Sequence, residues 1–480
     1  MTERLKEIID YLRKKKLDYA DIRHERTSFE DIKVKNGNVD GLSRNDDQGF
    51  GIRVIKGGAW GFAASSVVSF EEMKRVADAA IQIAGASALT KKEDVRLTPT
   101  EICQDKYESH YDVDPFAVSI DRKVGLLLEA CAILQKNPKI KVAEGSMNFF
   151  KTDKIFASTE GAFVEQSILQ SGSGIAATAV EGTEAQRRSY PNSAGGDYAC
   201  RGYEFVEELK LVEHAEKVRE EAVQLLSAPP LPEMMTTIII AGNQLALQVH
   251  ESCGHPTELD RVLGTEISLA GGSFMSLDKV NKLKYGSDQV TIVADATIPG
   301  GLGSFGYDDE GVKAQRVYLV RDGLFVGYQT SRETAAFVKQ QSNGTMRAQG
   351  WNRIPLIRMT NINLEPGKWE LEDLIRDTKD GVLLDTNKSW SIDDKRLNFQ
   401  FGVEAAWEIK NGKKGKMYKN GLYTGITPEF WNGCDAVCNR KYWHIWGLSN
   451  CGKGEPMQTM HVAHGTSPAR FRNVKVGVSK

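Results

Sequence analysis

Three prolines, Pro229, Pro230 and Pro232, stand almost together near the middle of the chain. Proline fixes its own φ and has no backbone N–H, so such a segment joins neither a helix nor a central strand. It favours a stiff, extended linker instead. A chain of 480 residues is also too long for one hydrophobic core. We therefore predict a domain boundary here, with one domain over residues 1–227 and another over residues 233–480.

The first domain is predicted to be mixed α/β with antiparallel strands. Short segments of alternating polar and apolar residues are separated by Asn36-Gly37 and Gly57-Gly58, pairs that favour tight hairpin turns. Apolar residues at helical spacing recur between them. The predicted strands are 19–23, 29–35, 39–44, 49–54, 141–148, 154–158 and 163–178, and the main predicted helices are 70–83, 118–135 and 205–226.

The second domain is predicted to be rich in β-structure. Residues 236–241 form a largely apolar strand, and Asp322-Gly323 joins the strand segments 316–320 and 324–329 as a hairpin. Residues 397–409 pair with 416–424 across a glycine-containing turn. The chain as a whole is therefore predicted to be α+β, with a barrel-like antiparallel sheet in its C-terminal domain.

Composition narrows the possible partners and the compartment. Lys and Arg total 62 against 64 Asp and Glu, and no basic patch or run of 18 apolar residues stands out. Neither nucleic acid nor a membrane is therefore expected as a partner, and residues 1–16 do not read as a signal peptide. The 7 cysteines are few and odd in number, which indicates a reducing compartment. We expect a soluble cytoplasmic protein.

The segment His250-Glu251-Ser-Cys-Gly-His255 follows the apolar strand and carries the most specific chemical signal. Imidazole nitrogens are good zinc ligands, and a neighbouring carboxylate can take a proton from water at the metal. With only 8 histidines in the chain, this spacing is expected about 0.01 times by chance. The alternative is a pair of ordinary histidines beside a Glu that forms a salt bridge.

The spacing of the two histidines raises a difficulty for an ideal helix. Residues five apart lie roughly 140° from each other around an α-helix, so both rings do not face one ion. Gly254 and Pro256 flank His255, and both residue types end helices. We predict a helix from about Gln244 that ends at Gly254 and returns His255 toward the metal.

A hydrolytic zinc site usually has three protein ligands, and the residues alone leave the third open. Cys451 stands out because a cysteine on a glycine-rich loop beside Lys453 is typical of an accessible thiolate. His461 and His464 are candidates for ligating the metal, orienting substrate or stabilising an oxyanion. The other possible ligands are Cys253, Glu258, His444 and the pair Cys434 and Cys438.

A second glycine-rich segment, Pro299 to Gly306, opens no helix and is not typical of a phosphate loop. Its backbone groups are suited to holding an extended peptide. We predict substrate contacts from Gly301, Gly303, Ser304 and Gly306. The acidic run Asp308-Asp309-Glu310 that follows is expected to bind a cation or a peptide amino group, or to be solvated.

These motifs resemble the TldD/PmbA family of zinc metalloproteases over nearly the whole chain. The resemblance rests on the His-Glu motif, on the glycine-rich segment ending at Gly311, on Arg358-Met-Thr-Asn361 and on Cys451-Gly-Lys453. It implies that His250, His255 and Cys451 hold one zinc ion and that Glu251 is the catalytic base. It also implies small or unfolded peptides as substrates, and a dimer with a second copy or with a metal-free paralogue.

We therefore predict a zinc-dependent metallopeptidase, with His461 and His464 as further substrate-binding candidates. Two alternatives stay open. In the first, the zinc stabilises a non-catalytic binding subunit, and the site closes with a fourth protein ligand such as Cys253, Glu258 or His464. In the second, Cys451 is the nucleophile of a thiol enzyme and a histidine is its base.

Overall fold

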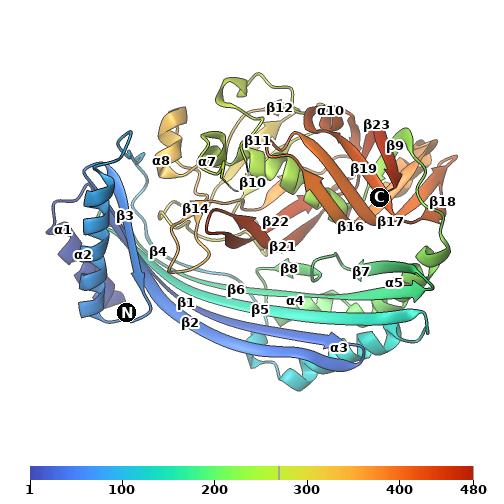
Figure 1. Ribbon diagram of the computed structural model, residues 1–480, viewed down its shortest axis with the longest axis horizontal. Coiled ribbons are helices and arrows are strands. Elements are labelled where there is room, and N and C mark those ends of the chain that lie inside the picture. The colour runs from blue at the N-terminus through green and yellow to red at the C-terminus, as the bar shows by residue number, and fades with distance from the viewer. Residues whose placement is uncertain (269–270, 479–480) are drawn as a thin grey trace.

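A computed structural model describes residues 1–268 and 271–478 and has two connected parts. Long N-terminal strands form a curved sheet, and the C-terminal region lies against its concave side (Figure 1). The first helices stand at one end of this sheet, and α3 (Ile120–Leu134) lies on its outer side. The predicted α+β class, with antiparallel strands first and a barrel-like sheet after them, is confirmed.

The N-terminal sheet has eight strands in the order β3-β2-β1-β5-β6-β4, with β7 and β8 also paired to β6. Several predicted short strands are in fact parts of longer ones, because polar residues such as Arg26 to Ser28 continue the ladder between β2 and β5. The strands are β1 (Tyr19–Lys35), β2 (Asn38–Lys56), β3 (Ala59–Ser65), β4 (Gln104–Glu108), β5 (Ile140–Ser158), β6 (Phe163–Glu181), β7 (Glu184–Tyr190) and β8 (Asp197–Ala199).

Helices cover one face of this sheet. Ala20 and Ile22 of β1 pack with the first two helices, and Ile32 and Val34 pack with the later ones, as the period of two along a strand requires. The predicted single helix over 205–226 is interrupted, because Lys210 adopts a left-handed backbone conformation with φ 50°. The covering helices are α1 (Thr2–Arg13), α2 (Phe70–Ser87), α3, α4 (Tyr203–Glu208) and α5 (Leu211–Ser227).

The opposite face of the sheet carries buried charges that join the two parts. Asp309 lies 2.6 Å from Lys154 of β5 and 3.4 Å from Arg23 of β1, measured between carboxylate oxygen and nitrogen. Glu310 lies 3.9 Å from Arg53 of β2. Burial opposes ionisation of Asp309, but these cations lower its pKa overall. The acidic run at 308–310 is therefore not solvated. Asp309 and Glu310 face basic residues of the sheet, and Asp308 accepts hydrogen bonds from backbone N–H groups instead.

The C-terminal region contains a closed barrel of five strands in the order β16-β9-β23-β19-β17. The pair β9–β16 is parallel and the other barrel pairs are antiparallel. The predicted strand over 416–424 is split into two around Asn420, whose φ is 53°. The strands here are β9 (Met234–Ile240), β16 (Asp380–Ile392), β17 (Asn398–Lys410), β18 (Lys413–Tyr418), β19 (Gly421–Ile426), β20 (Cys434–Val437) and β23 (Ala469–Val478).

Smaller elements complete the C-terminal region around the barrel. A hairpin of β21 (His444–Lys453) and β22 (Gln458–Thr466) lies close above the long strands (Figure 1). The others are α6 (Gly242–Val249), α7 (Leu259–Val262), β10 (Ile292–Asp295), β11 (Arg316–Arg321), β12 (Leu324–Phe325), α8 (Arg332–Ala335), β13 (Met346–Arg347), β14 (Leu356–Ile357), β15 (Ile362–Leu364), α9 (Leu371–Asp377) and α10 (Thr427–Asn432). Within the described residues, no helix has the length and apolar character needed to span a bilayer.

Replacement of Asp309 tests the buried ion cluster. Asp309→Asn removes one of the two buried carboxylates that Arg23 and Lys154 share, the other being that of Glu25. Removal of one partner of a buried ion pair typically costs about 3–5 kcal/mol. We expect urea denaturation to show a loss of this order. The matched control is Asp373→Asn, whose half-exposed carboxylate pairs with Arg376 on α9 and should matter by about 1 kcal/mol or less. Equal stability of the two variants would contradict the importance of the cluster.

Candidate metal centre

The helix after β9 changes its winding at the motif. α6 continues into a π-helical turn, His250–Gly254, which is closed by a hydrogen bond from the His255 N–H to the His250 carbonyl. A π-helical turn joins residues five apart, so it returns His255 to the side of His250. The ring centroids lie 4.8 Å apart with the planes at 90°. The helix ends at Gly254 as predicted, but His255 is returned by the widened turn before that end, and a 3₁₀ turn over His255–Thr257 follows it.

Neighbouring side chains satisfy the carbonyls that this turn leaves free. Pro256 has no N–H to offer Ser252, and the Tyr285 hydroxyl donates to the Ser252 carbonyl at 3.0 Å. The Thr257 hydroxyl donates to the Cys253 carbonyl at 2.8 Å. Gly254 has a normal helical φ, and its role is steric, because a Cβ there would lie 2.1 Å from the sulfur of Met359.

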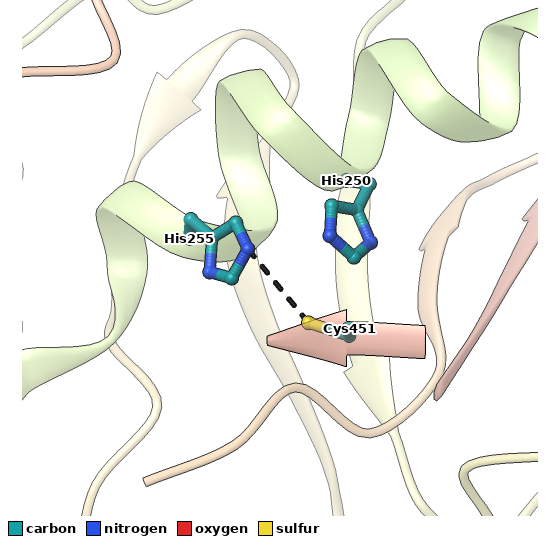
Figure 2. A group of neighbouring side chains, drawn as sticks. All are labelled: His250, His255 and Cys451. Atoms are coloured by element: carbon teal, nitrogen blue, oxygen red, sulfur yellow. Dashed lines mark hydrogen bonds between the residues drawn. The ribbon is translucent and has the colours of Figure 1, made fainter. Parts of the chain in front are cut away.

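Cys451 reaches the two histidines from the hairpin. In β21, the pairing with β22 shifts between Leu448 and Cys451, which indicates a β-bulge, and a bulge changes the direction of the side chains that follow it. The Cys451 sulfur lies 3.7 Å from His255 Nε2. The three potential ligand atoms of His250, His255 and Cys451 all lie within 4.8 Å of one another (Figure 2). The structure thus brings together the three ligands implied by the resemblance.

Hydrogen bonds behind both imidazoles leave their other nitrogens facing this group. His464 Nδ1 lies 3.2 Å from the Ile362 carbonyl, which only accepts, so Nδ1 carries the proton. His464 Nε2 then accepts from His250 Nδ1 at 2.7 Å. His255 Nδ1 donates to Glu258 at 3.0 Å. Such partners fix the tautomer and orientation of metal-binding histidines, so Nε2 of each ligand ring carries a free lone pair.

Charged groups support Glu258 in turn. Lys453 lies 3.5 Å from Glu258 and 2.7 Å from Asp260, and Arg261 also pairs with Glu258. Burial opposes ionisation of Glu258, but Lys453 and His255 bring its pKa well below the ordinary value. Lys453 is therefore a fully buried member of this network, and Cys451 is only 3% exposed. The predicted accessible loop at 451–454 is wrong, because both residues end a paired strand.

The protonation states of the three potential ligands favour binding of a metal cation. Burial lowers the pKa of His250 to about 4, and burial also lowers the pKa of His255. For Cys451, burial raises the thiol pKa, but the adjacent His255 and Arg358 bring it below the ordinary value overall. At neutral pH the group therefore offers two neutral imidazoles and a sulfur that ionises readily, the protonation states in which these residues bind metals.

Glu251 lies beside this group and does not belong to it. Glu251 is 5% exposed and lines a cavity of about 280 Å³ that is also lined by His250, His255 and Cys451. The guanidinium of Arg396, from the turn between β16 and β17, forms an ion pair with it. The cavity therefore contains the potential ligands, a carboxylate and a cation in one place.

The structure places the other predicted site residues elsewhere. His461 lines a second cavity of about 520 Å³, where its Nδ1 lies 2.6 Å from the amide oxygen of Gln170. The Gly303 and Gly306 N–H groups already donate to Asn361 and Gln166. Gly301 is buried near Asn361, Ser304 lines the second cavity, and His464 lies behind His250 and also borders the first cavity. Substrate contacts by these residues stay a prediction.

The remaining ligand candidates have other surroundings. Cys253 is completely buried in the hydrophobic core, where burial raises its pKa. His444 lies 2.6 Å from Asp197. Cys434 and Cys438 are buried, and Cys434 lies in the strand β20. In the part of the chain that the structure describes, none of these joins the group of three.

Two contributors were missed by reasoning from sequence. The role of Glu258 as a partner of His255 had a usable signal, since a carboxylate three residues after a histidine on a helical segment can reach it. The contact of Arg396 with Glu251 had no signal in the sequence, because 145 residues separate the two along the chain.

Comparisons with known proteins identify chains that are similar over nearly the whole length. Residues 20–84, 113–226 and 233–478 match domain 1, the central domain and the C-terminal domain of the PmbA/TldA metallopeptidases. A metalloprotease of Methanocaldococcus jannaschii is 29% identical over 420 residues, covering 88% of this chain and 89% of its own. A metalloprotease TldD homolog of Haemophilus influenzae is 24% identical, covering 99% and 96%. TldE from Thermococcus kodakarensis shares the fold, with a TM-score of 0.78, 18% identity and coverage of 99% and 100%.

Substitution of His464 tests the hydrogen bond behind His250. His464→Leu removes the acceptor that fixes the tautomer of His250, and loss of such a partner typically weakens metal binding about 10–100-fold. His464→Gln is the matched control, because its amide oxygen can still accept from Nδ1. We expect competition with a chromogenic chelator for cobalt or zinc to show the loss in the leucine variant and a smaller one in the glutamine variant. Equal affinity of wild type and His464→Leu would contradict this role.

Proposed function

The chain belongs to the PmbA/TldA metallopeptidase family, and we propose that it is a zinc-dependent peptidase with His250, His255 and Cys451 as ligands and Glu251 as base. The observation that carries the proposal is the convergence of the three ligand atoms beside the Glu251 carboxylate, in one cavity. The names of the relatives, which are metalloproteases, support the same class of reaction.

The donor set fits zinc in particular. Zinc favours nitrogen and sulfur ligands, and its bond lengths set the ligand atoms of a tetrahedral site about 3.3–3.6 Å apart. The 3.7 Å between Cys451 Sγ and His255 Nε2 is close to this spacing. Three protein ligands leave one position for water or substrate. Once bound, the ion would polarise the scissile carbonyl and lower the pKa of water.

Glu251 is suited to moving the proton. It follows His250 directly in the chain and faces the same cavity without belonging to the group of ligand atoms. In the proposed reaction, Glu251 takes a proton from the attacking water and passes it to the leaving amine. The carbon–nitrogen bond of the peptide breaks, a carbon–oxygen bond forms, and one water is consumed.

A structural metal is the less favoured reading. Such a site would need a fourth protein ligand, and two of the candidates have other partners, since Glu258 pairs with His255 and His464 with His250. Cys253 belongs to the hydrophobic core. The fourth direction is therefore left to the cavity.

One observation favours the thiol alternative. The Cys451 sulfur faces an imidazole nitrogen of His255, as the nucleophile and base of a thiol enzyme would. The same contact serves two ligands of one ion equally well. Cys451 is also 3% exposed, and a nucleophile needs access to its substrate. Metal content and the effect of Glu251 separate the two mechanisms.

The finer expectations stay predictions. These are small or unfolded peptides as substrates, and a dimer formed with a second copy or with a metal-free paralogue.

Metal content per chain is the first test. We expect about one zinc per chain by mass spectrometry after reconstitution, because a site of three protein ligands holds one ion. His250→Ala should lose this metal, whereas His110→Ala, at an exposed histidine outside the site, should keep it. Absence of zinc from the reconstituted wild type would contradict the mechanism.

Exchange of Glu251 tests the base. Glu251→Gln keeps the shape of the side chain and removes its ability to take a proton. We expect zinc content to be unchanged and peptide hydrolysis to fall about 10²–10⁴-fold. The control Glu213→Gln, at an exposed glutamate of α5, should keep full activity. Retained activity in Glu251→Gln, with loss of activity in Cys451→Ser that still binds metal, would favour the thiol mechanism instead.

A further inference from the structure

Arg396 is the single cationic side chain among the described residues that line the metal-site cavity, and Glu251 is the single carboxylate. The two form an ion pair across 145 residues of sequence. The pairing occupies the carboxylate that the proposed mechanism needs for proton transfer. A second anion would be required to pair with Arg396 while Glu251 transfers the proton.

The Arg396 guanidinium has N–H donors that no acceptor of the described chain uses. Arginine carries five side-chain N–H donors, and within the described chain Glu251 is the only acceptor that contacts the Arg396 guanidinium. Arg396 Nε is buried and has no hydrogen-bond partner among the described residues. Trp446 Nε1 and Asn387 Oδ1, which belong to residues of the same cavity wall, also lack one. Buried polar atoms without partners are rare in native proteins, and these three belong to residues that line one cavity.

Arg396 is placed to change partners. It lies in the turn that joins β16 to β17, with φ 63°, and its side chain is 13% exposed. An arginine fork matches the two oxygens of a carboxylate. A carboxylate that enters the cavity therefore competes with Glu251 for the same donors.

We propose that Arg396 binds the C-terminal carboxylate of a peptide substrate and thereby releases Glu251, so that the site acts on the last peptide bond. This inference rests on the proposed peptidase function. Arg396 would then determine specificity, and the ion pair in the free protein would keep the base occupied until a chain end arrives.

Distances favour the chain end over the middle of a peptide. Successive Cα atoms are about 3.8 Å apart, so the terminal carboxylate lies within roughly one residue of the nitrogen that the reaction releases. Glu251 adjoins the ligand His250 and touches Arg396, so the base, the metal group and the cation also lie close together. A cavity of about 280 Å³ is at the small end of the usual range for ligand sites.

The reaction that follows is hydrolysis of one bond. Water adds across the last peptide bond, its oxygen joins the carbonyl carbon, and the nitrogen leaves as the amine of a free amino acid. Glu251 carries the proton from the water to that amine. The products are one amino acid and a peptide shorter by one residue, and no oxidant or further reactant is needed.

Binding tests the carboxylate contact without relying on turnover. The probes are acetyl-Ala-Ala-Ala and its C-terminal amide, measured by calorimetry on zinc-loaded Glu251→Gln protein. We expect the acid to bind at least about tenfold more tightly than the amide, as the loss of a charge-assisted hydrogen bond implies. The preference should vanish in the double variant with Arg396→Gln and persist with Lys395→Gln, a charge change at an exposed position of the same turn.

The same comparison reports on the release of Glu251. The wild type should bind the acid more weakly than Glu251→Gln does, because its own carboxylate competes for Arg396. Its apparent affinity is the intrinsic affinity multiplied by the fraction of protein in which Arg396 is unpaired. The amide should show no such difference. Equal binding of acid and amide in Glu251→Gln would overturn the proposal. An amide with a C-terminal glutamate that binds as tightly as the acid would overturn the assignment to the chain terminus.

Hydrolysis separates this inference from the proposed function. We expect wild type to release alanine from the acid and to leave the amide largely intact, with Arg396→Gln losing the discrimination and Arg396→Lys keeping part of it. If wild type cleaves acid and amide equally well, or if Arg396→Gln slows both equally, Arg396 merely positions Glu251 and the proposal fails while the peptidase stands. If neither is cleaved but the acid still binds through Arg396, the carboxylate contact holds and the peptidase function fails.

Discussion

One backbone hydrogen bond, from His255 to the His250 carbonyl, makes a spacing of five residues compatible with one metal ion. Everything else at the centre adapts to that wider turn. It occurs where the chain is almost completely buried, so its unpaired carbonyls would be costly there. The hydroxyls of Tyr285 and Thr257 supply the missing donors. The turn is therefore a property of the surrounding core as much as of its own sequence.

The third ligand depends on how the hairpin of β21 and β22 is held. Arg358 is completely buried and donates to the backbone carbonyls of Cys451 and Gln458, one on each strand. Arg347 donates to the carbonyl of His461 in β22 and to that of Met359 in the segment between β14 and β15, and so ties the hairpin to that segment. The hairpin thus separates two cavities, with Cys451 facing one and His461 the other. The buried cluster around Asp309 fixes the long sheet that forms the far wall of the second cavity.

Charge is distributed in two layers around the potential metal ligands. Behind His255, two acidic and two basic side chains balance one another in a closed network. In front, toward the cavity, one carboxylate faces one guanidinium. The first layer has no exposed member and serves orientation. The second borders a space that a ligand can enter, and its ion pair can therefore be exchanged for a contact with that ligand.

Local patterns in the sequence determined the element types and the chemistry of the site. The period of two, the glycine turns and the His-Glu motif identified the antiparallel strands, the barrel-like region and the residues that carry the proposed reaction. The sequence did not determine the length of the strands, because polar residues inside β1 and β2 are paired only by their neighbours. It also left open the third ligand, which the family resemblance selected.

Tertiary structure decided the rest, because those properties depend on groups far apart in the chain. The helix widens at His250 since Tyr285 and Thr257 can satisfy it, and Cys451 points inward since a bulge in the hairpin turns it. Lys453, Asp309 and Glu310 are buried because opposite charges come to them from other elements. Arg396 contacts Glu251 only because the strands β16 and β17 belong to a closed barrel. No periodicity or motif in the sequence indicates a contact of that kind.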